Sequence, residues 1–268
     1  MPFHPSVVAD AAEQLRAHTV ALLDDLDNDE LERAALPGWT VADVLRHLAE
    51  SDRTVVLGRR LLDFLPWVAA AQMEQRNDRA LRRLRGVSRY RLRAELDAWG
   101  RRLQTIIRRA PAPLARLQVP TMFGRVTLGW FATLRLYDEW VHQDDIHRAV
   151  GRAQPDVDLQ TAALLAEFHL RALPAGPLRH VDRRASVVEI TFTDAPTVAG
   201  WRFDLARRQY GPDVTQRPTV HIATDVRTWS RVAADRTPWR DAERSGALTV
   251  EGWDRAAAET LLDAVRVV

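Results

Sequence analysis

Three side chains able to bind one metal ion occur within the first 150 residues of the chain, two of them at helical spacing. Asp138 and His142 are four residues apart, so on a helix a carboxylate and an imidazole can point at the same ion. His47 lies on an apolar stripe with Val44 and Leu48, so a second helix could bring a third ligand. Three nitrogen and oxygen ligands leave a coordination position open, as in catalytic zinc sites, and nickel(II) or iron(II) would accept the same set.

Simpler interpretations of these residues stay open at this point. His47 could be a core histidine bonded to a backbone carbonyl group. Asp138 and His142 could form an ordinary side-chain pair on a helix surface that faces water. Arg135 and Asp145 lie on the same helical line, and they are candidates for orienting a ligand or a substrate if the metal site exists.

The composition excludes several kinds of chemistry. Cysteine is absent from the 268 residues, which excludes disulfides, thiolate metal ligands and a cysteine nucleophile. Lysine is absent too, so the 38 cationic side chains are all arginine and Schiff-base chemistry is excluded. The 36 carboxylates leave a formal net charge of only +2, so the chain lacks the strong excess of positive charge that would attract nucleic acid.

The composition also favours a globular protein of the cytoplasm. Hydrophobic residues make up 46% and charged residues 28%, as in ordinary folded domains. No segment approaches the roughly 18 apolar residues of a membrane span, and the N-terminal segment lacks the pattern of a secretion signal. We therefore expect a cytoplasmic monomer or homodimer that binds neither membranes nor nucleic acid.

The candidate ligands lie in a half of the chain that is predicted to be helical. Apolar residues recur at helical spacing in four segments, at about 5–27, 40–61, 87–109 and 127–150. Thr40 followed by Asp43 is typical of a helix start, and Gly151 is typical of a helix end. Four such helices joined by short connections predict a bundle, with a short strand pair near 119–126.

The second half of the chain alternates between helix-like and strand-like patterns. Helices are predicted near 159–172, 225–234, 238–244 and 253–267, and strands near 186–193, 201–205, 219–223 and 247–250. A mixed pattern after a purely helical block predicts an α + α/β protein of two domains, at 1–152 and 158–268.

The segments around the candidate ligands resemble a known family. The run PGWTVADVLRHLAESDR, followed later by YDEWVHQDDIHRAVGR, is similar to the mycothiol-dependent maleylpyruvate isomerase family of the DinB-like metalloenzyme superfamily. The resemblance implies a DinB-like four-helix bundle at 1–152 and, more weakly, a small sterol-carrier-like α/β domain at 158–268. It also implies that His47, Asp138 and His142 bind a divalent metal, usually zinc. Several members have glutamate where Asp138 stands, and Glu139 is out of register with the family's spacing.

The resemblance further implies a thiol-dependent enzyme. A thiol on the metal would be deprotonated at neutral pH, and since the chain has no cysteine it must come from a cosubstrate, which is mycothiol in this family. Attack on an electrophilic small molecule would give cis–trans isomerisation if the thiol is expelled again, or S-transfer if it is retained. Arg135, and less strongly Arg46 and Arg53, are expected to bind anionic groups of the thiol or substrate, and Arg135 is the expected catalytic arginine.

Other functions fit the same sequence. A non-catalytic module could bind a small molecule or lipid in its C-terminal domain, with a vestigial metal site. A metal hydrolase could use water in the open coordination position. A nucleic-acid role is least favoured because the charges are balanced and no basic run with interleaved aromatic residues occurs.

Overall fold

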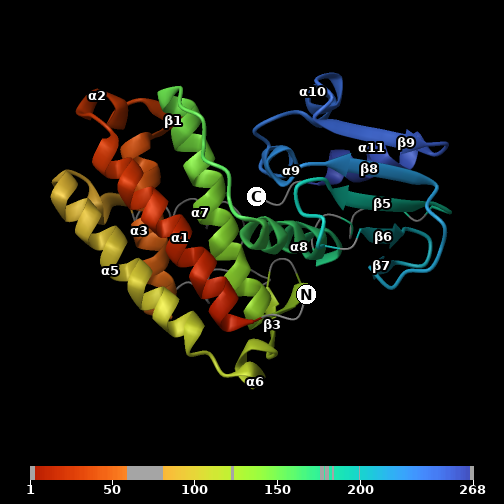
Figure 1. Cartoon of the computed structure of the whole chain (residues 1–268), viewed down its shortest axis with the longest axis horizontal. Coiled ribbons are helices and arrows are strands. Elements are labelled where there is room, and N and C mark those ends of the chain that lie inside the picture. The colour runs from red at the N-terminus through yellow and green to blue at the C-terminus, as the bar shows by residue number, and fades with distance from the viewer. Residues whose placement is uncertain are drawn as a thin grey trace. The chain divides into compact units, whose positions relative to one another are not determined.

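The chain folds into two compact units, Pro2–Asp156 and Val157–Val268, which are described separately. The first unit is mostly helical and the second combines helices with a five-stranded sheet, so the predicted mixture of a helical region and a sheet-containing region is confirmed (Figure 1). The computed structural model describes residues 4–58, 81–121, 124–175, 178, 181–182, 184–198 and 200–265.

The helical unit contains four long helices that pack against one another. They are α1 (Pro5–Asp25), α3 (Val41–Val56), α5 (Arg89–Arg108) and α7 (Leu128–Val150). Helix α1 contacts α5 and α7, and α3 contacts the same two helices (Figure 1). The second helix ends earlier than predicted, because Gly58 adopts a positive φ of 70° just after it; residues 59–61 lie outside the described residues.

Local signals in the sequence fix where α3 and α7 begin and end. Thr40 and Asp43 form the predicted capping box, with the Asp43 amide donating to Thr40 Oγ1 at 3.2 Å. Thr127 caps the start of α7 by accepting from the Trp130 amide at 3.1 Å. Gly151 ends α7 in the left-handed conformation, with φ of 73°.

Helix α7 is buried along most of its length. Residues on several sides of it are buried, including Leu136, Tyr137, Trp140 and Ile146. A helix surrounded in this way also buries its polar side chains, which must then find partners inside the protein. Within the described ranges, none of the helices combines the length and apolar composition that a membrane crossing requires.

Short elements complete the helical unit. They are α2 (Asn28–Leu31), β1 (Ala34–Leu36), β2 (Trp39–Thr40), α6 (Ala112–Ala115), β3 (Gln118–Thr121) and β4 (Gly124–Thr127). Strands β3 and β4 form the strand pair predicted near 119–126. The hairpin of β1 and β2 runs directly into α3, so it places Trp39 beside the start of that helix.

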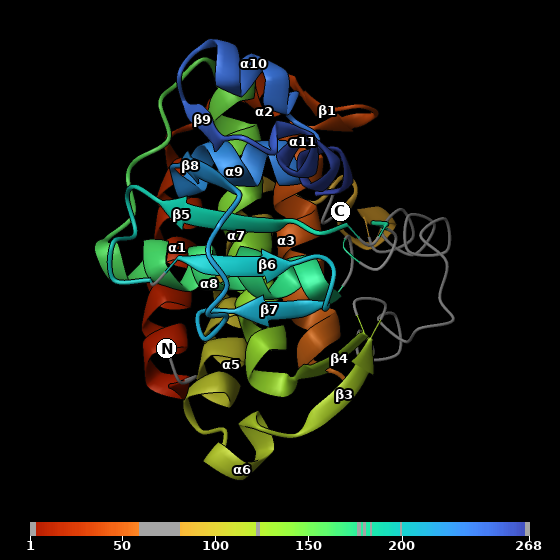
Figure 2. The ribbon, with the colours of Figure 1, turned by 90° about the vertical axis from the view of Figure 1, so that its right-hand side faces the viewer.

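The second unit is a five-stranded sheet with helices packed on it. In chain order its elements are α8 (Leu159–Ala175), β5 (Val187–Phe192), β6 (Trp201–Asp204), β7 (Gln209–Gly211), β8 (Val220–Thr224), α9 (Val226–Ala233), α10 (Trp239–Arg244), β9 (Leu248–Gly252) and α11 (Arg255–Ala264). The strand order is β7-β6-β5-β8-β9, with only β5 and β8 parallel (Figure 2). Helix α11 contacts β5, β8 and β9.

Candidate metal centre

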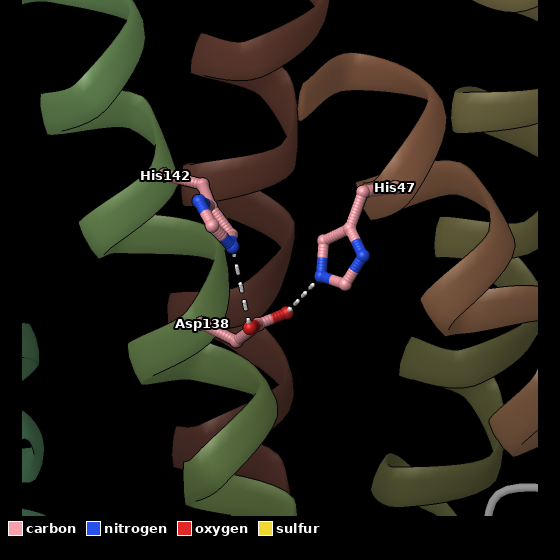
Figure 3. Close-up of side chains that lie close together, drawn as sticks. All are labelled: His47, Asp138 and His142. Carbon is pink, nitrogen blue, oxygen red and sulfur yellow. Dashed lines mark ion pairs between the residues drawn. The ribbon is translucent and has the colours of Figure 1, made fainter. Parts of the chain in front are cut away.

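His47, Asp138 and His142 converge in the space between α3 and α7 (Figure 3). His47 Nε2 lies 3.7 Å from Asp138 Oδ2, and His142 Nε2 lies 3.6 Å from Asp138 Oδ1. One ligand atom from each residue lies within 4.8 Å of the other two. The packing of α3 on α7 therefore brings together the three residues that the spacing had singled out.

The three side chains fit a divalent metal ion. In a tetrahedral zinc site with bonds of about 2 Å, neighbouring ligand atoms are about 3.3 Å apart. The distances of 3.6 and 3.7 Å exceed this value by a few tenths of an ångström, which small side-chain rotations can close. The side chains of His47 and His142 are 6% and 11% exposed, whereas that of Asp138 is 25% exposed. The site is thus mostly enclosed, with its carboxylate nearest to solvent.

A buried carboxylate orients the ring of His142, and a serine hydroxyl group contacts the ring of His47. Asp145, which is buried, lies with Oδ2 at 3.0 Å from His142 Nδ1, so the other ring nitrogen of His142 faces Asp138. A carboxylate behind a histidine in this way is typical of metal ligands, because it fixes the ring and raises its basicity. Ser51 Oγ lies 3.3 Å from His47 Nε2, the nitrogen that faces Asp138.

Arg135 also lies at this site, whereas Arg46 and Arg53 bond acidic residues of their own helix. Arg135 Nη1 donates to Asp138 Oδ2, and its side chain is only 10% exposed. Arg46 Nη1 donates to an aspartate oxygen at 2.9 Å and Arg53 Nη1 to a glutamate oxygen at 3.1 Å, each three residues earlier in α3. The structure thus joins Arg135 directly to a candidate ligand.

A buried network of charged side chains lies next to the site. Its members Arg16 and Asp52 were not among the residues predicted for the site. Asp52 Oδ1 accepts from Arg135 Nη2 at 2.8 Å, and Asp52 Oδ2 accepts from Arg16 Nη2 at 2.5 Å. Arg16 Nη2 also donates to Glu139 Oε2 at 2.6 Å, and Thr19 donates to the other oxygen of Glu139. Burial opposes the charge of Arg16, but Asp52 and Glu139 outweigh it and raise the pKa of that guanidinium.

A signal for this network exists in the sequence. Arg16, Asp52 and Glu139 each lie at helical steps from residues of the apolar core. Arg16 is seven residues from Leu23, and Asp52 is four residues from Leu48. A charged residue at a position of an apolar stripe is buried on folding and must then be paired with an opposite charge. Charged residues at such positions therefore indicate buried ion pairs.

The indole ring of Trp39 lies beside the imidazole rings of His47 and His142. Its ring centroid is 5.1 Å from that of His47 and 6.5 Å from that of His142, with an angle of 22° between the latter two planes. The residue is half-buried and belongs to β2. The hairpin before α3 therefore contributes to the surroundings of the site as well as to the start of the helix.

Two histidines and a carboxylate held between helices give the helical unit of this protein a candidate metal-binding site. The family model described as the mycothiol maleylpyruvate isomerase N-terminal domain matches residues 12–147, about half of the chain. The chain belongs to this family, as the sequence motifs predicted.

Solved structures resemble the whole chain. One is the crystal structure of the mycothiol-dependent maleylpyruvate isomerase, with 16% identity, a TM-score of 0.56, and 92% of this chain and 93% of that chain covered. Another is a histidine-to-alanine mutant of the mycothiol-dependent maleylpyruvate isomerase, with 15% identity and the same TM-score and coverage. At such identities the likeness shows a shared fold. A comparison with curated proteins finds no match.

Proposed function

We propose that this protein is a mycothiol-dependent enzyme in which the thiolate of the cosubstrate attacks an electrophilic small molecule. The single observation that carries the proposal is the convergence of His47, Asp138 and His142 in a chain of this family. The absence of cysteine supports it, because a reactive thiol must then come from outside the chain. The similar crystal structure is also described as mycothiol-dependent.

His47, Asp138 and His142 would hold a divalent metal, with zinc as the first choice and nickel(II) or iron(II) as alternatives. When bound, such a cation supplies the positive charge that keeps a coordinated thiol deprotonated near neutral pH. Asp138 contributes the negative charge of the ligand set. Asp145 keeps the ring of His142 in its orientation from behind.

The remaining residues of the site would bind and orient the reactants. Trp39 offers an apolar ring beside both histidines. Arg135 stays the predicted catalytic and thiol-binding arginine, and Arg46 and Arg53 stay the weaker binding candidates. Because Arg135 already bonds Asp138, its contact with a reactant would be made beside that carboxylate.

The reaction has two outcomes that share a first step. A C–S bond forms between the thiolate and an electrophilic carbon. In isomerisation the attacked carbon belongs to a C=C bond conjugated with a carbonyl group, so the π electron pair moves to the carbonyl oxygen as the C–S bond forms. After rotation about the resulting C–C single bond the pair returns, the C–S bond breaks with its electrons on the thiolate, and the product is the trans isomer. If the substrate instead loses another group with its electron pair, the product is an S-conjugate.

The finer assignment of the fold belongs to the same proposal. We assign residues 1–152 to a DinB-like four-helix bundle that holds the metal, supported by the contacts of α1 and α3 with α5 and α7. We assign residues 158–268 to a sterol-carrier-like α/β domain, supported by the mixed sheet and by the packing of α11 on it.

Turnover measurements test the proposed function. Zinc-loaded protein is supplied with maleylpyruvate, or with a small alkylating electrophile, in the presence of mycothiol, of glutathione or of no thiol. We expect turnover with mycothiol, none without a thiol, and none in His47→Ala or His142→Ala. Full activity in a His47→Ala protein free of metal contradicts the proposal. Thiol-independent hydrolysis of an ester by the metal-loaded protein favours a hydrolase, and a co-purified lipid in a metal-free protein favours a binding module.

A further inference from the structure

We propose that Asp52 is a positioning residue of the metal centre. Through Arg135 it holds one oxygen of Asp138 and leaves the other oxygen to the metal. Asp52 lies on α3, five residues after His47, so the helix that carries one candidate ligand also anchors another. The inference rests on the metal site of the proposed function, and it adds a residue that controls how that site binds its ion.

The two oxygens of Asp138 have different surroundings. Each oxygen faces one histidine, Oδ1 facing His142 Nε2 at 3.6 Å and Oδ2 facing His47 Nε2 at 3.7 Å, but Oδ2 also accepts a charged hydrogen bond from Arg135. An oxygen engaged by a guanidinium group donates less electron density to a cation than a free one. Arg135 therefore favours coordination of the metal by Oδ1 alone, which keeps more positions open for a thiol and a substrate.

Asp52 holds Arg135 in the geometry that this requires. Arg135 Nε and Nη2 donate to the same oxygen of Asp52, at 3.1 and 2.8 Å. The other oxygen of Asp52 accepts from Arg16 Nη2, at 2.5 Å, on α1. The Asp52 residue is only 2% exposed, so it is not free to swing away from these partners. The hydrogen bonds of Asp52 therefore link α3 to α1 and to α7 next to the candidate ligands.

The nearest alternative anchor for Arg135 is already engaged. Glu139 Oε2 lies 3.6 Å from Arg135 Nη2, beyond hydrogen-bond distance. The same oxygen accepts from Arg16, and the other oxygen of Glu139 accepts from Thr19. Loss of Asp52 would therefore leave the Arg135 guanidinium without the fork of hydrogen bonds that orients it.

Position and charge are separate contributions of Asp52. The ion pairs around Asp52 join two arginines, Arg16 and Arg135, to three carboxylates, those of Asp52, Asp138 and Glu139. Two positive and three negative charges leave one net negative charge, which attracts a cation. Asp52→Asn removes the charge but keeps the shape. Asp52→Glu keeps the charge but moves the carboxylate by one methylene group.

The affinity for Co²⁺, measured by competition with a chelator, and the visible absorption of the Co²⁺-loaded protein test this role. We expect Asp52→Asn to weaken binding by about 10- to 100-fold, with a changed cobalt spectrum. Asp52→Glu changes the spectrum as well, since position matters. Glu30→Gln is the matched control, because Glu30 is also buried and bonded to an arginine, Arg152, outside the site. It leaves affinity and spectrum unchanged.

A second variant covers the case in which Asp52→Asn does not fold. Arg135→Lys leaves Asp52 bonded to Arg16 and keeps the positive charge, but it removes the fork that holds Oδ2 of Asp138. The same spectral change is expected. Unchanged affinity and spectrum in Asp52→Asn or, failing that, in Arg135→Lys overturn the role of Asp52. A wild-type protein that binds Co²⁺ but shows no thiol-dependent turnover overturns the proposed function and leaves the test of Asp52 intact. A wild-type protein that binds no Co²⁺ overturns both.

Discussion

Each unit of this protein buries a histidine in a helix, and the two histidines have opposite surroundings. His142 in α7 faces Asp138 on one side and Asp145 on the other. His169 in α8 is 0% exposed, and its Nε2 lies 2.6 Å from the hydroxyl of Ser230. Burial lowers the pKa of His169 to about 3, so its ring is neutral near pH 7. A histidine buried beside a serine hydroxyl group is therefore a neutral core residue, whereas a histidine buried among carboxylates is a candidate metal ligand.

The same contrast holds for buried charge in the two units. The helical unit buries Arg16, Asp52, Glu139 and Asp145 close to the candidate ligands. Among the described residues of the second unit, Asp204 is the one acidic or arginine residue that is buried. A protein tolerates buried charges where they are paired and where they serve a site, because each unpaired charge costs several kcal/mol. These buried charges of the helical unit thus lie around the candidate metal site.

The largest effect on stability is expected from Arg16→Met. Removal of the guanidinium leaves the buried carboxylates of Asp52 and Glu139 without their shared cation, which lowers the free energy of unfolding by about 3–5 kcal/mol. Urea denaturation measures the loss, and hydrogen exchange locates it in α1, α3 and α7. The control is Arg93→Met, which breaks the exposed pair with Asp24 and changes stability little. A loss no larger than that of the control contradicts the role given to the network.

Substitution of the partners of His142 and His169 provides the next test. Asp145→Asn is expected to weaken metal binding by about 10- to 100-fold, because the amide no longer supports the ring of His142 with a negative charge. Ser230→Ala removes the matching partner of His169 and should leave metal affinity as it is. Isothermal titration calorimetry of the metal-free proteins measures the affinity of both variants and of wild type for Zn²⁺. Equal affinity for Zn²⁺ in Asp145→Asn and wild type would contradict a role of Asp145 in supporting His142 as a metal ligand.

The pH dependence of stability tests the neutral state of His169. An unfolded histidine takes up a proton near pH 6.5, but folded His169 does so only near pH 3. The unfolded state therefore binds more protons between these values, and stability falls as the pH falls. Between pH 7.5 and pH 5 the contribution is about 2 kcal/mol. Hydrogen exchange in α8 and α9 should show this loss in wild type and a smaller one in His169→Gln. An equal loss in both proteins contradicts burial of a neutral ring.

The smallest effect is expected from the helix caps. Thr40→Ala removes the side-chain cap of α3, which carries His47, and should cost about 1 kcal/mol. Asp225→Ala removes the cap of α9 in the second unit at a similar cost. Thermal unfolding measures both. Metal affinity should stay close to that of wild type in each variant, because α3 is held by its packing on α5 and α7. Loss of metal binding in Thr40→Ala contradicts this view of how His47 is held.

The sequence predicted the long elements because each carries a repeated pattern, and capping residues also mark ends of α3 and α7. Helix α7 follows from its apolar residues, from Thr127 and from Gly151. The hairpin of β1 and β2 and the strand β7 escaped prediction because two or three residues are too few to show a period.

The candidate ligands on α7 were predictable for the same reason, and so were their neighbours Arg135 and Asp145, but Arg16 and Asp52 were not. Asp138 and His142 share one helix, so their spacing alone brings them together. The pairing of Asp52 with Arg16 and Arg135 depends on how three helices pack, which no local pattern encodes. The sequence marked these residues only as charges that interrupt apolar stripes.

The zinc content of the purified protein tests whether His47, Asp138 and His142 bind one metal ion together. Wild type, His47→Ala and His169→Gln are saturated with zinc, freed of loosely bound ions and analysed. We expect one tightly bound ion per chain in wild type and in His169→Gln, and none in His47→Ala. Retention of the ion in His47→Ala, or its loss in His169→Gln alone, would show that these three residues do not form the site.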